Sequence, residues 1–185
     1  KRKMGIYLLS LLVITGLAGT INNNTISKSE RKFAIGVMKD TYKDAVKTTK
    51  GLTIAQLNFK SANDNWSIKE CIYHIAWSEK KLWGIFEKAM NGPANPEKRA
   101  EITLTDEQIQ ELIVCHSLEQ METEQTQPIS TKYNSVNQAL SDFNTTHLAQ
   151  IRYIKNTTED LRNHVVELPF GWVDAYQLYL VIASH

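Results

Sequence analysis

The sequence predicts an all-α protein, an antiparallel four-helix bundle with long connections and a short extra helix, over residues 28–185. Three observations predict this class. Four long segments place apolar residues at helical spacing, and each begins after a good capping residue. No run of alternating residues predicts a sheet, and there is no repeat and no glycine-rich phosphate loop. A chain of 185 residues, 42% hydrophobic and 22% charged, suits one domain with a sizeable core.

The first helix is predicted over residues 28–47. Ser27 and Glu30 have the spacing of a capping box, in which the side chain and backbone of two residues bond reciprocally. Gly51 follows the helix and is expected to adopt the left-handed conformation that ends many helices. Residues 53–65 are then a connector.

The second helix has the clearest start in the chain and is predicted over residues 67–90. Ser67 and Glu70 form a second capping box directly after Trp66. The segment "NGPANPEKRA", with one glycine and two prolines, ends this helix and begins a loop over residues 91–104.

The second half of the chain predicts one short and two longer helices. Thr105 caps the short extra helix, "DEQIQELIVCHSLEQM", and Ser135 begins a long helix that runs to about residue 154. The segment "NTTEDLRNHVVELPFGW" reads as a turn-rich return. Asp174, with Gln177 in the box position, caps the last helix, "DAYQLYLVIASH".

The first residues differ from the rest of the chain. "KRK" is a basic cluster, and "MGIYLLSLLVITGLA" follows it without a charge. This pattern predicts a signal peptide over residues 1–18, cleaved after Ala18, and then a flexible lead-in over residues 19–27. The alternatives are an uncleaved anchor, which would be the one contact with a membrane, and a buried first helix. We therefore expect an exported protein, periplasmic or secreted.

The charge and the cysteines exclude some classes of function. A formal net charge of +1 gives no sign of a nucleic-acid surface, so no nucleic-acid partner is expected. Two cysteines, Cys71 and Cys115, allow one disulfide but no disulfide framework. Both lie in apolar helical segments, where a cysteine is expected to be a small buried residue.

Five histidines are the candidates for chemistry: His74, His116, His147, His164 and His185. His74 lies among isoleucines on the second helix, and His185 continues an apolar stripe on the last one. Taken singly, each is more often a structural residue than a ligand. His116 and the adjacent Cys115 point about 100° apart on a helix and do not make a good chelate. His147 either faces a site, packs in the core or makes a hydrogen bond between helices, and His164 is expected to be solvated.

The segment "WSIKECIYHI", residues 66–75, resembles the signature of the DinB-like family of four-helix-bundle metalloproteins. In that family a tryptophan and a serine cap open the second helix, and a histidine seven residues after the serine binds a metal. Trp66, Ser67 and His74 match these positions. The segment "PFGWVDAYQLYLVIASH" is similar to the family's last helix, which carries an H-x-x-x-H pair. His185 matches the first member of that pair.

The resemblance implies a metal site whose ligands include His74 and His185. The second member of the pair would follow four residues after His185, outside this sequence; otherwise the site has two protein histidines. Imidazole ligands suit a divalent metal ion, with zinc or nickel expected. The resemblance also implies dimers in some members, so a homodimer is an expectation here.

The resemblance further implies an exported metal-dependent enzyme of the hydrolase type, acting on a small-molecule substrate that the sequence does not identify. A metal-dependent thiol S-transferase is an alternative, which export disfavours because low-molecular-weight thiols are chiefly cytosolic. A non-catalytic exported binding module with an incomplete or vestigial metal site is the other alternative. No catalytic base is evident. Glu70 has its capping role, and Glu79 and Tyr73 are expected to point to other sides of the helix than His74. Trp66 and Trp172 are expected to serve in packing rather than as walls of a pocket.

Overall fold

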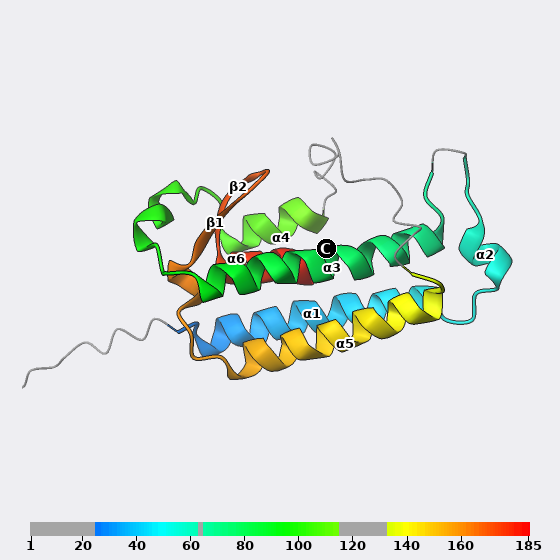
Figure 1. Cartoon of the computed structure of the whole chain (residues 1–185), viewed down its shortest axis with the longest axis horizontal. Helices are drawn as coiled ribbons and strands as arrows, with labels where there is room; N and C mark the ends of the chain where they lie inside the picture. The colour runs from blue at the N-terminus through cyan, green and yellow to red at the C-terminus, as the bar shows by residue number, and fades with distance from the viewer. Residues whose placement is uncertain (1–24, 63–64, 115–132) are drawn as a thin grey trace, which may run out of the picture.

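The computed structural model describes residues 25–62, 65–114 and 133–185 and confirms the all-α class. Its four main helices, given with the bounds of each, are α1 (Lys28–Thr49), α3 (Ile68–Asn91), α5 (Val136–Asn156) and α6 (Ala175–Ser184). Figure 1 shows them side by side as a bundle. The predicted signal peptide and most of the lead-in lie outside the described residues.

The predicted caps explain why the helices begin where they do. The side chains of Ser27, Ser67 and Asp174 each accept a hydrogen bond from the backbone three residues later, and each capping box is complete. Ser135 caps α5 in the same way, without the reciprocal bond. Gly51 has φ of 78°, in the left-handed region that a glycine adopts without strain. These local signals were read correctly from the sequence.

The arrangement of the four helices cannot be predicted from any local sequence signal. α1 packs against α5 and α6, and α3 packs against the same two helices, so that helices consecutive in the chain are often diagonal. α1 and α6 run in one direction, and α3 and α5 run in the other (Figure 1). Two helices therefore point each way, and the two diagonal crossings account for the long connections before α3 and before α6.

The connections contain short elements that the sequence did not predict as such. A one-turn helix α2 (Ile54–Asn58) and a 3₁₀ helix η1 (Pro96–Glu101) lie in the predicted connector and loop. The predicted return contains a second 3₁₀ helix, η3 (Leu161–Asn163), and an antiparallel hairpin of β1 (Val165–Leu168) and β2 (Gly171–Asp174). Strands of four residues are too short to show alternation, which is why the hairpin was missed. The extra helix α4 (Asp106–Val114) packs on α6.

The last helix forms the centre of the main core. Every residue from Ala175 to Ala183 is buried, which fits a helix that is apolar on all sides. Its neighbours in this core include Met38, Phe86 and Ile154 from the other three main helices. Because α6 is surrounded, its C-terminal end lies inside the bundle. No helix in the described part of the chain is both long and apolar enough to cross a membrane.

Candidate metal centre

The start of α3 is held in a fixed geometry near His74. The backbone N–H and hydroxyl of Ser67 both donate to Glu70 Oε2, at 2.7 and 2.8 Å, and Lys60 Nζ lies 2.9 Å from Glu70 Oε1. Burial alone would raise the pKa of Glu70, but these hydrogen bonds and the Lys60 charge outweigh it and lower the pKa to about 2. Glu70 is therefore an ionised structural carboxylate, as its capping role predicts.

The structure brings the two predicted ligands together. The imidazole ring of His74, on α3, lies with its centroid 5.3 Å from that of His185, which caps the C-terminal end of α6. The two residues are 111 positions apart in the sequence, and the antiparallel packing of α3 on α6 makes them neighbours. Nδ1 of each ring is buried and makes no hydrogen bond to any other described residue.

Burial sets the charge of this pair. It lowers the pKa of His74, and it lowers the pKa of His185 to about 4, with the nearby His74 adding to the effect. At pH 7 both rings are therefore neutral, and a neutral imidazole has the free lone pair that a metal ligand needs. Two unpaired, neutral and neighbouring ring nitrogens are a donor set that suits zinc or nickel.

Two residues contact the His74 ring, one just before α3 and one on α3. Trp66 meets the His74 ring edge-on, with centroids 5.0 Å apart, so this tryptophan is a wall of the site. The Ser78 hydroxyl lies 3.3 Å from His74 Nε2, one turn further along the helix. Trp172, by contrast, is remote from the pair and lies under the Lys98 ammonium, 5.0 Å from the ring centroid.

Among the described residues no group of three or more histidine, cysteine, aspartate or glutamate side chains is arranged to hold a metal. The pair His74 and His185 therefore offers two candidate donors among the described residues. That these histidines bind a metal stays a prediction.

Glu79 is buried and pairs with a residue of another helix. Its side chain is only 4% exposed, and its Oε1 lies 3.2 Å from His147 Nδ1. His147, on α5, also bonds through Nε2 to the Met38 carbonyl of α1. The interhelical role that was one of the two readings of His147 is therefore present. Glu79 follows Ile72 and Ile75 by seven and four residues, so its place on their apolar stripe was the signal that could have found it.

The structure corrects the expected burial of one cysteine and one histidine and leaves the expectations for Cys115 and His116 untested. Cys71 is exposed, not buried, because it lies on the outer side of α3. His164 is half-buried, not solvated, and its Nδ1 donates to the Ala89 carbonyl at 2.9 Å. Cys115 and His116 lie outside the described residues.

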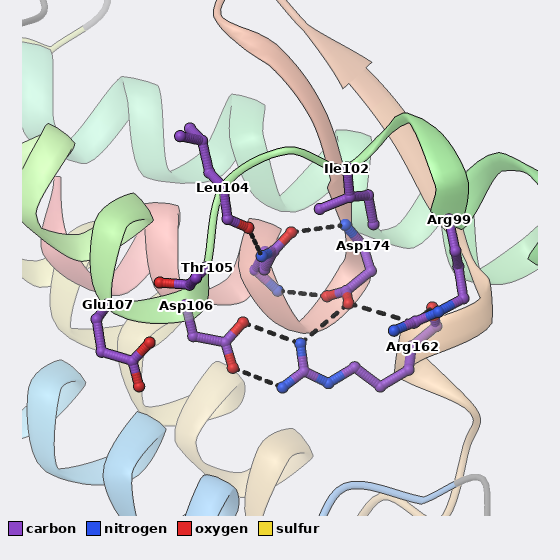
Figure 2. A pocket seen from close by; sticks show the side chains of 9 residues that line it. Arg99, Ile102, Leu104, Thr105, Asp106, Glu107, Arg162 and Asp174 are labelled. Atoms are coloured by element: carbon purple, nitrogen blue, oxygen red, sulfur yellow. Dashed lines mark hydrogen bonds and ion pairs between the residues drawn. The ribbon is translucent and has the colours of Figure 1, made fainter.

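Another hollow in the described part of the chain lies at the N-terminal end of α6. It has a volume of about 470 Å³ and is lined by charged residues, among them Arg99, Asp106, Arg162 and Asp174. Figure 2 shows the Arg162 guanidinium between the Asp106 and Asp174 carboxylates, with Arg99 on the far side of Asp174. These charged side chains already pair with one another. The residues that line the hollow therefore form a structural ion-pair network. The histidine pair is the better candidate for a site despite the smaller space beside it.

Comparison with known proteins gives one result. The family model of the DinB superfamily matches residues 38–185, which include both histidines of the pair and all of α3, α5 and α6. Neither the curated proteins nor the solved structures contain a match to this chain.

Proposed function

Because this chain belongs to the DinB superfamily, we propose that it is a metal-dependent enzyme of the hydrolase type, with His74 and His185 as two of its metal ligands. The observation that carries the proposal is the pair itself. Its two rings meet from distant parts of the sequence, and each keeps a buried Nδ1 without a partner among the described residues. Leaving buried nitrogens unpaired is costly, so such a pair is expected to have a ligand.

The residues around the pair support the same function. Ser78 bonds to the His74 ring and so restricts its rotation, and Trp66 covers its edge. A divalent ion bound here would supply Lewis acidity, which polarises a substrate carbonyl and makes water easier to ionise. The neutral state of both imidazoles means that binding needs little proton release near pH 7.

Metal analysis of the purified protein tests the proposal. We expect the wild-type protein, loaded with zinc and then dialysed, to retain about one zinc per chain, and we expect His74→Ala and His185→Ala to lower that content at least tenfold. Loss of one ligand removes a large part of the binding free energy, and tenfold corresponds to about 1.4 kcal/mol. Zinc content is measured by atomic absorption.

His164→Ala is the matched control. It also removes one half-buried histidine, but that residue bonds to Ala89, which is 15 residues and about 22 Å along α3 from His74. Its zinc content should equal that of the wild type. Equal zinc in all four proteins would refute the assignment of the pair and would favour a binding module without a metal site.

We also propose that the protein is exported, on the basis of the basic cluster and apolar stretch within residues 1–18. N-terminal sequencing of the protein recovered from a host that secretes it should give a chain that begins after Ala18. Recovery of the uncleaved chain only from the cytosolic fraction would count against export.

A further inference from the structure

A buried acid–base pair lies at mid-height of the bundle. Glu79 on α3 and His147 on α5 are each no more than 4% exposed, and both sit among apolar and aromatic neighbours. The rings of Tyr42 and Phe143 each lie 5.2 Å from the His147 ring, centroid to centroid. Ionisable groups are rarely buried so fully unless they are paired.

The hydrogen bonds fix the number of protons in this pair. The Met38 carbonyl can only accept, so His147 Nε2 carries a hydrogen and donates it. Nδ1 then bonds to Glu79 Oε1 only if one more proton lies on either atom. The pair therefore holds one shared proton and is neutral overall, whichever partner carries it. Burial raises the pKa of Glu79, and the His147 bond and charge only partly oppose that rise.

The second oxygen of Glu79 has no such partner. Oε2 is buried and makes no hydrogen bond to the described part of the protein. Glu79 and His147 both line a cavity of about 50 Å³ between the four main helices, and His185 and Thr41 line the same cavity. This volume holds one or two waters. Glu79, which has one carboxylate oxygen without a partner in the described part of the protein, and His185 thus line one small space.

We propose that Glu79 is the proton acceptor of the site, oriented by His147, and that it exchanges protons with a water in the cavity that His185 also lines. This inference rests on the proposed hydrolase function. It assigns His147 a positioning role, since His147 acts through its bond to Glu79. A buried carboxylate held by an imidazole and free at one oxygen is suited to accept a proton.

The proposed step balances as ordinary ester hydrolysis. In the starting state the shared proton of the pair lies on His147 Nδ1 and Glu79 is ionised. One O–H bond of water breaks, its proton bonds to Glu79 Oε2, and its electron pair forms the new bond to the acyl carbon. The acyl–oxygen bond to the leaving group then breaks, and the proton moves from Oε2 to the leaving oxygen. Water is consumed, an acid and an alcohol form, and Glu79 returns to its first state.

The variant Glu79→Gln tests the inference in zinc-loaded protein, with nitrophenyl acetate as the probe ester. The amide keeps the size of the side chain and can donate to His147 Nδ1, so the fold is expected to survive, while the proton acceptor is lost. We expect kcat to fall roughly 100-fold with little change in KM and with no loss of zinc. Glu87→Gln, which changes an exposed carboxylate on the same helix, is the matched control and should behave as the wild type.

A second readout does not depend on turnover. The carboxyl ¹³C resonance of Glu79, assigned by its absence in Glu79→Gln, is titrated in wild-type protein with and without zinc. The charged or titratable groups that act on Glu79 are His147 on α5, Tyr179 on α6 and Tyr133 just before α5, with His185 across the cavity. Zinc at the histidine pair should move the Glu79 titration to lower pH, because a nearby cation favours the carboxylate.

The outcomes separate the two proposals. Zinc content that is unaffected by the histidine variants overturns the proposed function and this inference with it. Zinc bound through the histidines, with an unchanged Glu79 titration and with kcat of Glu79→Gln within threefold of the wild type, overturns this inference alone.

A shorter acid covers the case in which Glu79→Gln does not fold. The variant Glu79→Asp keeps the carboxyl group but shortens its reach toward the cavity. It should lower kcat while the zinc-dependent shift of the carboxyl titration persists. Full kcat in the Glu79→Asp protein counts against the inference.

Discussion

Replacement of Arg162 by methionine is expected to lower the free energy of unfolding by about 3 kcal/mol. The Arg162 guanidinium donates to carboxylates from three different helices, Glu30 on α1, Asp106 on α4 and Asp174 at the cap of α6. Asp174 is 2% exposed as a side chain, so the substitution leaves a buried charge without its main partner. Urea denaturation at pH 7, followed by circular dichroism, measures the change.

The geometry at Arg162 explains why one side chain has so large an effect. The three carboxylates each lie at a helix N-terminus, where the partial positive charge of the helix favours an anion, but together they repel one another. Arg162 cancels that repulsion, and its guanidinium also lies over the Tyr176 ring, 4.2 Å from the centroid. Methionine keeps much of the apolar stem and removes only the charge and the donors.

Arg152→Met is the matched control for this prediction. Arg152 is an exposed arginine on α5, and surface substitutions of this kind usually change stability by less than about 0.5 kcal/mol. Equal midpoints for the two variants would show that the Arg162 network does not stabilise the fold.

Acidification is expected to remove the stabilisation that Glu70 gives to the start of α3. The pKa of Glu70 in the folded protein is about 2, below its ordinary value of 4.5, so the unfolded chain binds a proton first as the pH falls. The stabilisation is therefore fully present above about pH 4.5 and is lost as the pH falls through about 2. The full shift corresponds to about 3 kcal/mol, and we expect about 1.5 kcal/mol because Lys60 is partly exposed to solvent.

The variant Glu70→Gln separates this effect from the rest of the titration. It should be about 1.5 kcal/mol less stable than the wild type at pH 7, and the difference should become much smaller near pH 2, where about half of the wild-type carboxyl is protonated. Denaturant unfolding at a series of pH values measures the difference. Glu87→Gln, on the exposed side of the same helix, should differ from the wild type by a small and constant amount. A Glu70→Gln difference that stays the same from pH 7 down to about pH 2 would contradict the prediction.

The sequence by itself determined where the helices begin and which two histidines to examine. Capping boxes such as those at Ser67 and Asp174 depend on residues three apart, so they can be recognised without knowing the fold. His74 and His185 were singled out by the resemblance of residues 66–75 and of the last helix to the family's patterns, which also lie within short stretches of sequence. The all-α class followed from the same local periodicity.

Only the tertiary structure decided which side chains meet inside the bundle. Glu79 and His147 are 68 residues apart, and Arg162 and Glu30 are 132 apart, so no local pattern relates them. A residue in the middle of a long helix faces whichever neighbour the packing supplies, and α3 here packs against both α5 and α6. The pairing of Glu79 with His147 is therefore a consequence of helix arrangement, because the direction of a side chain around its helix has meaning only once the adjacent helices are placed.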